Sequence, residues 1–176
     1  MSLLHAFPSV VQGYHQHEFV LSVQLPTGGV FYCETPARDL LQQWIMAVAY
    51  AAARYSSAPL AMPQSSGFGN FIQPTMPSHL STLEVPQQRE AFARKVAEME
   101  VNIAAHNESK GTNLGKSEAQ NWEKKSNFMI GEVQKYRMYM LALDGYKGPG
   151  SAMEAPLGGV LFHAASEASL LQQPKE

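Results

Sequence analysis

Hydrophobic and polar positions alternate from His17 to Leu25. Apolar side chains occupy one face of this stretch and more polar ones the other, namely Phe19, Leu21, Val23 and Leu25 against Glu18, Ser22 and Gln24. A period of two predicts a β-strand with one buried face. The glycines after Pro26 can take the positive φ of a tight hairpin, so residues 30–35 are expected to return antiparallel. Residues 2–7 are expected to add a third short strand.

A helical period follows the second strand. Thr35-Pro36 is a typical helix start. A threonine oxygen can accept a hydrogen bond from a backbone N–H, and proline at the first helical position sacrifices no intrahelical hydrogen bond. Apolar residues then recur three and four apart as far as the Ser56-Ser57-Ala58-Pro59 stop, at Leu40, Leu41, Trp44, Ile45, Val48, Ala52 and Tyr55. We therefore expect one helix with Trp44 as a structural residue on its inner face.

Two further helices are predicted at about residues 86–106 and 117–144. Their apolar seams have heptad spacing, with Phe92, Val96, Met99 and Ile103 in the first and Trp122, Ser126, Met129, Val133, Tyr136, Met140 and Leu143 in the second. A polar turn of about ten residues joins them, which favours an antiparallel coiled-coil hairpin. Trp122, Tyr136 and Tyr139 are either seam residues or a partner-binding face, since aromatic residues are enriched at interface hot spots.

Composition divides the chain into four expected segments. Residues 1–60 hold the sheet and its helix, and 61–84 form a linker rich in proline, serine and glycine. Residues 85–145 form the hairpin, and 146–176 are expected to be a disordered tail. Charge supports a boundary near Leu83, because the chain before it has no lysine. The predicted fold class is therefore α+β.

Charge and composition exclude several classes of function. A net charge of −2 over 176 residues argues against nucleic acid as a partner. The single cysteine, Cys33, fits a reducing compartment, and its strand position predicts a buried thiol. The longest apolar run is far below the ~20 residues that cross a bilayer. His15 and His17 lack a third ligand nearby, and no catalytic triad, paired carboxylates or nucleotide loop is present, so no catalytic, cofactor or metal site is predicted.

The order of strand pair, capped helix and helix tryptophan resembles the last third of a pleckstrin-homology (PH) domain. In that fold a C-terminal helix plugs one end of a bent seven-stranded sheet, and Trp44 falls where the family has its helix tryptophan. Several stretches resemble more narrowly the PSD family of Arf guanine-nucleotide exchange factors, which join a Sec-seven catalytic domain, a PH domain and a C-terminal coiled coil. These stretches are Leu4-His5-Ala6, His17-Glu18-Phe19-Val20-Leu21, Ala51-Ala52-Ala53 leading into Ser56-Ser57-Ala58-Pro59-Leu60, and Phe128-Met129 with Tyr136 and Tyr139.

The resemblance implies a partial PH sheet of about three antiparallel strands, capped by its C-terminal helix and followed by the hairpin. Because nothing in the sequence supplies the first four strands, Met1 is expected to lie inside a domain. The alternative is a small sheet that is complete as it stands, which so short a segment makes marginal for independent folding.

The resemblance also implies a function. The chain would be the non-catalytic, membrane-targeting and regulatory part of an Arf exchange factor, cytoplasmic and peripheral at the plasma membrane. Its expected partners are a phosphoinositide surface, an Arf-type GTPase and cytoskeletal or regulatory proteins. Tyr14, His15 and His17 are the candidate lipid contacts, although neutral imidazoles clamp phosphate poorly. The alternative is a protein-interaction scaffold with a PH-like platform that binds no lipid.

Overall fold

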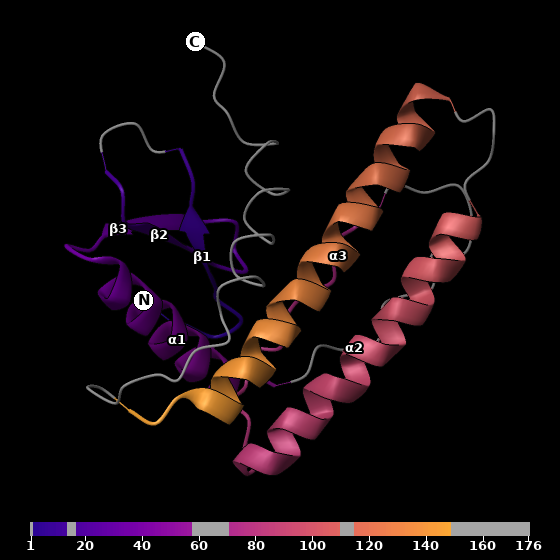
Figure 1. Ribbon diagram of the computed structural model, residues 1–176. Helices are drawn as coiled ribbons and strands as arrows, with labels where there is room; N and C mark the ends of the chain where they lie inside the picture. The colour runs from indigo at the N-terminus through magenta and orange to yellow at the C-terminus, as the bar shows by residue number, and fades with distance from the viewer. Residues whose placement is uncertain (1, 14–16, 58–70, 110–114, 149–176) are drawn as a thin grey trace.

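A small antiparallel sheet and three helices make up the fold (Figure 1). The computed structural model describes residues 2–13, 17–57, 71–109 and 115–148. The elements follow in the order β1 (Phe7–Val11), β2 (Val20–Gln24), β3 (Val30–Glu34), α1 (Arg38–Tyr55), α2 (Val85–Glu108) and α3 (Lys116–Gly145). The sheet is open, with strand order β1-β2-β3. This arrangement confirms the α+β class.

The sheet is a meander in which β2 lies between two antiparallel neighbours. Leu21 of β2 pairs with Val10 of β1 and with Cys33 of β3. Gly28 takes a φ of +88° in the β2–β3 turn, the left-handed conformation that glycine adopts at no steric cost. The prediction of a buried Cys33 is wrong, because β3 is the outer strand and its side chains from Phe31 to Glu34 are exposed.

The first strand lies further along the chain than predicted. Residues 2–7 were expected to be extended, yet β1 begins only at Phe7. His5 takes a φ of 56°, in the left-handed region, and the Ala6 backbone N–H donates to the Leu3 carbonyl oxygen at 3.1 Å. This local turn interrupts any strand before Phe7, and it places the His5 side chain in the interior.

Trp44 is not on the inner face of α1, so that prediction is wrong. Its side chain is 57% exposed, whereas its neighbour Ile45 is fully buried. At about 100° per residue, the buried face is rotated by roughly 90° from the predicted stripe. The buried positions include the small residues Ala49, Ala52 and Ala53, whose lack of bulk lets α3 approach α1 closely. Packing against α3 thus decides which face is buried.

Helices α2 and α3 form the predicted antiparallel pair (Figure 1). Residues early in α2 meet residues late in α3, and the reverse holds at the other end. Arg89 Nε lies 2.6 Å from Asp144 Oδ1, while the His106 ring stacks on Trp122 with centroids 4.6 Å apart. The loop between the helices includes residues 110–114, which lie outside the described residues.

The hairpin shares one hydrophobic core with the sheet and α1. Tyr136 and Tyr139 are fully buried there, and both rings lie against Phe92 of α2 at centroid distances of 5.3 and 5.4 Å. Their burial agrees with the seam alternative, and a partner-binding role for these two tyrosines stays a prediction. The predicted boundaries at residues 60 and 84 stay predictions, and the tail 149–176 lies outside the described residues.

Candidate functional site

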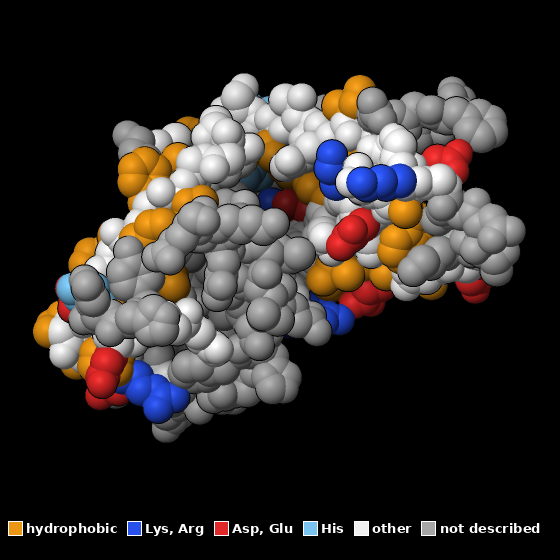
Figure 2. All heavy atoms as spheres, turned by 90° about the horizontal axis from the view of Figure 1, so that it is seen from above, with side chains coloured by type: hydrophobic (Ala, Val, Ile, Leu, Met, Phe, Trp, Pro, Cys, Tyr) orange, Lys and Arg blue, Asp and Glu red, His pale blue; other side chains and the backbone are white. Residues whose placement is uncertain are grey.

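A cavity of about 610 Å³ lies where the sheet, the segment before α2 and helix α3 meet. Figure 2 looks into a hollow at whose base basic and acidic side chains lie between apolar ones. Its lining combines apolar side chains with several carboxamides and four ionisable groups: His5, Phe7, Gln24, Leu25, Pro26, Phe71, Gln73, Met76, Lys124, Asn127, Phe128, Ile130, Gly131, Glu132, Gln134 and Lys135. Its volume is within the range of small-molecule sites.

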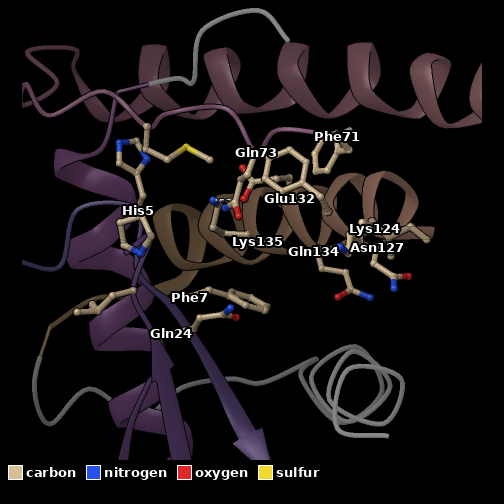
Figure 3. A pocket seen from close by; sticks show the side chains of 16 residues that line it. His5, Phe7, Gln24, Phe71, Gln73, Lys124, Asn127, Glu132, Gln134 and Lys135 are labelled. Carbon is tan, nitrogen blue, oxygen red and sulfur yellow. Dashed lines mark hydrogen bonds and ion pairs between the residues drawn. The ribbon is translucent and has the colours of Figure 1, made fainter. Parts of the chain in front are cut away.

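Glu132 and Lys135 of α3 form a buried ion pair in this lining. Figure 3 shows both side chains beside Gln73 and Phe71 of the segment before α2. The second carboxylate oxygen of Glu132 accepts a hydrogen bond of 2.8 Å from the Tyr136 hydroxyl. Burial lowers the pKa of Lys135 below its ordinary value, and the nearby Glu132 carboxylate opposes that shift. The cavity wall therefore holds an ammonium group whose charge is balanced locally.

His5 lines the same cavity and is 3% exposed. Its Nε2 lies 2.9 Å from the Pro77 carbonyl oxygen. Because a carbonyl only accepts hydrogen bonds, Nε2 carries the proton, and Nδ1 of the neutral ring is an acceptor. Nδ1 has no hydrogen-bond partner among the described residues. Burial lowers the pKa of His5, and the bond to Pro77 opposes the shift, so the neutral form is favoured.

A buried hydrogen-bond network fixes the segment before α2 against α1. The Gln88 side-chain amide donates to the Ala53 carbonyl oxygen at 2.9 Å and to the Ser56 carbonyl oxygen. Its carbonyl oxygen accepts from the Ser81 hydroxyl at 2.6 Å. Ser56 in turn accepts the His5 backbone N–H through its hydroxyl at 2.7 Å. These polar contacts thus connect His5, which lines the cavity, to the segment before α2 through Ser56 and Gln88.

The apolar walls come from three separate parts of the chain. Phe7 belongs to β1, and Leu25 follows β2. Phe71 lies against Phe128 of α3 with ring centroids 5.5 Å apart. Gly131 of α3 also lines the cavity, and a Cβ built on it would have no atom of the described residues within 4 Å. The middle of α3 therefore faces open space at this residue.

Of the predicted lipid contacts, His17 lies among the described residues, and it is not part of the cavity lining. Tyr14 and His15 lie outside the described residues. His17 precedes β2, and its Nδ1 lies 2.8 Å from Glu34 Oε1 of β3. Trp122 donates from Nε1 to the His106 carbonyl oxygen at 3.2 Å and is half-buried. A partner contact at Trp122 stays a prediction.

Sequence reasoning missed His5, Glu132 and Lys135. Glu132 and Lys135 are three apart on a helix, a spacing that usually marks an exposed ion pair. The available signal was their position beside Val133 and Tyr136 in the heptad seam. His5 gave a weaker signal, since its burial depends on a turn that the strand prediction did not include.

Neither a metal-binding cluster nor a membrane-spanning helix is found among the described residues. Within residues 2–13, 17–57, 71–109 and 115–148, no group of three or more histidine, cysteine or acidic side chains is arranged to hold a metal ion. Over the same ranges, no helix combines the length and apolar character that a bilayer crossing requires.

The sequence was compared with those of known proteins and protein families. No family model matches the sequence. The chain is 26% identical over 113 residues to a protein of Caenorhabditis elegans described as "Exchange factor for Arf-6", an alignment that covers 64% of this chain. The aligned part spans 14% of the length of that relative. This similarity supports a relationship to Arf exchange factors.

Proposed function

We propose that this chain is a non-catalytic, membrane-targeting and regulatory part of an Arf guanine-nucleotide exchange factor. The observation that carries the proposal is the similarity to the exchange factor for Arf-6, which extends over 64% of the chain. The order of strand pair, helix and helical hairpin supports it, because this is the order expected for the end of a PH domain followed by a coiled coil. The sheet with α1 is the PH part, and α2 with α3 is the coiled coil.

The shared core supports a regulatory role in which the two parts act as one unit. Helix α1 packs against both β1 and α3, and Gln88 hydrogen-bonds the last turn of α1. A membrane-bound sheet would therefore hold the hairpin at a fixed angle to the bilayer. The hairpin would present its outer faces to an Arf-type GTPase or to cytoskeletal and regulatory proteins. The whole would be cytoplasmic and peripheral at the plasma membrane.

A nucleotide-exchange assay tests the non-catalytic part of the proposal. The full chain is added to an Arf GTPase loaded with a fluorescent GDP analogue, and nucleotide release is followed with and without phosphoinositide vesicles. We expect the intrinsic release rate, since the chain contributes membrane and partner contacts and no exchange chemistry. Acceleration of release by the chain alone would contradict this assignment. A catalytically competent exchange factor serves as the positive control.

The alternative function is a protein-interaction scaffold that binds no lipid. It is favoured by the pairing of His17 with Glu34, because a carboxylate at 2.8 Å competes with a lipid phosphate for the imidazole. The exposed apolar side chains of Phe31 and Trp44 also suit a protein partner. Vesicle sedimentation distinguishes the two functions. Salt-sensitive pelleting that requires phosphoinositide supports the membrane role, and its absence supports the scaffold.

A further inference from the structure

We propose that the cavity beside α3 is a binding site for a small uncharged molecule that has an apolar body and a carbonyl oxygen. The proposal does not depend on lipid binding. Three features carry it: the space in front of Gly131, the buried ammonium of Lys135 and the carboxamides of the lining.

Gly131 keeps space open along the middle of α3. A glycine inside a helix costs stability relative to alanine, and within the described part of the chain no atom near Gly131 excludes a side chain. A larger residue there would project into the cavity that Gly131 lines. The aromatic rings of Phe7, Phe71 and Phe128 supply walls for an apolar body. Shape and lining thus fit a ligand with a flat or aromatic core.

Lys135 provides a hydrogen-bond donor inside the cavity lining. Its side chain is 4% exposed, and an ammonium group has three N–H donors. Glu132 accepts one of them, while the Tyr136 ring lies 5.0 Å from Nζ. A ligand carbonyl oxygen would accept another. This contact would be charge-assisted, which makes it stronger than one between neutral groups.

The local charge balance selects an uncharged ligand. The Glu132 carboxylate already neutralises Lys135. Removing an anionic ligand from water would therefore cost free energy that no unpaired buried cation among the described lining residues would offset. Lys124 also lines the site, but its side chain is exposed to solvent, where its attraction for an anion is screened. The remaining polar lining consists of the neutral His5 ring and the carboxamides of Gln24, Gln73, Asn127 and Gln134, which are uncharged donors and acceptors.

Three probes of similar size test the ligand class on the full chain. Acetophenone has the apolar ring and the carbonyl, ethylbenzene lacks the carbonyl, and benzoate replaces the ketone by an anion. Binding is followed through the ¹³C-methyl NMR signals of Met76 and Ile130, which line the cavity. We expect saturable shifts with acetophenone and at least tenfold weaker binding of the other two. Equal binding of ethylbenzene, tighter binding of benzoate, or no shift with acetophenone would overturn the proposal.

Two variants locate the site. Gly131→Leu fills the open space and is expected to weaken acetophenone binding at least tenfold, with helical circular dichroism unchanged. Ala97→Leu, at an exposed position of α2, is the matched control and is expected to bind as the wild type does. If Gly131→Leu fails to fold, Gly131→Ala replaces it and is expected to weaken binding at least threefold while raising the melting temperature. Wild-type binding by the folded Gly131 variant would overturn the assignment of the ligand to this cavity.

Discussion

The Tyr139 hydroxyl of α3 donates a hydrogen bond of 2.6 Å to the carbonyl oxygen of Ala6, at the start of the sheet. Both residues are fully buried, and 133 positions separate them in the sequence. This bond joins the hairpin directly to the segment that precedes β1. Replacing Tyr139 by Phe removes the donor and leaves the Ala6 carbonyl oxygen buried without it.

Tyr139→Phe is therefore expected to lower the free energy of unfolding by about 1–3 kcal/mol, the usual cost of an unsatisfied buried group. Tyr55→Phe is the control, because Tyr55 is exposed, and it is expected to change stability by less than about 0.5 kcal/mol. Urea denaturation followed by circular dichroism measures both. Equal stability of the two variants would show that the hydroxyl adds nothing to the junction.

Gln88→Ala is expected to loosen the junction between α1 and α2. The variant removes donors to the Ala53 and Ser56 carbonyl oxygens and an acceptor for Ser81. We expect a loss of about 2–4 kcal/mol, because several buried partners lose their bonds together. Hydrogen exchange should rise at the last turn of α1 and the first turn of α2. Asn102→Ala, on the exposed side of α2, should leave both measurements near wild type.

The exposure of Trp44 predicts that truncating it is tolerated in this chain. Trp44→Ala should lower the free energy of unfolding by less than about 1 kcal/mol, whereas Ile45→Ala should lower it by about 2–5 kcal/mol. In a Trp122→Phe background, Trp44 fluorescence should be readily quenched by acrylamide. A blue-shifted, protected signal, or a larger loss from Trp44 than from Ile45, would place the indole in the core.

Acid is expected to destabilise the fold below neutral pH. Burial lowers the pKa of both His5 and His106 below the ordinary value of 6.5. The unfolded chain therefore binds more protons than the folded chain as the pH falls through 6.5, and stability present above pH 6.5 is lost toward the lower folded pKa values. Urea denaturation should show a lower free energy of unfolding at pH 5.5 than at pH 7.5.

A variant of His106 distinguishes the contributions of the two histidines to the pH dependence of stability. His106→Gln should retain a donor to the Trp122 carbonyl oxygen while removing one titrating group, so its loss of stability between pH 7.5 and 5.5 should be smaller. Constant stability across this range in the wild type, or an increase in acid, would show that the buried imidazoles are not held neutral.

The local periods of the sequence were sufficient to predict most elements. Each of these patterns reflects one buried face: alternation around Leu21, and heptad spacing around Phe92 and Tyr136. The strand β2 and the helices α2 and α3 therefore lie close to their predicted positions. The face of α1 was not predictable in the same way. Its buried alanines are only weakly hydrophobic, so they contribute little to the pattern in the sequence. Their small size matters only where another helix, α3, packs closely against α1.

The cavity was beyond the sequence patterns for a similar reason. Its ionisable lining comes from residues far apart in the chain, with His5 before β1 and Lys135 near the middle of α3. Their proximity depends on how the sheet sits against the hairpin, which no local period encodes. Gly131 gave a partial signal, because a helix-interior glycine costs stability and so calls for a packing explanation.

Vesicle sedimentation is the most direct test of the proposed membrane role. The full chain is centrifuged with phosphatidylcholine vesicles that contain or lack a phosphatidylinositol bisphosphate, at about 0.1 and 0.5 M salt. We predict pelleting only with the phosphoinositide, reduced at high salt, and reduced further in a variant with Tyr14, His15 and His17 replaced by Ala. A chain that stays in the supernatant with every vesicle, at both salt concentrations, would contradict membrane targeting and favour the scaffold.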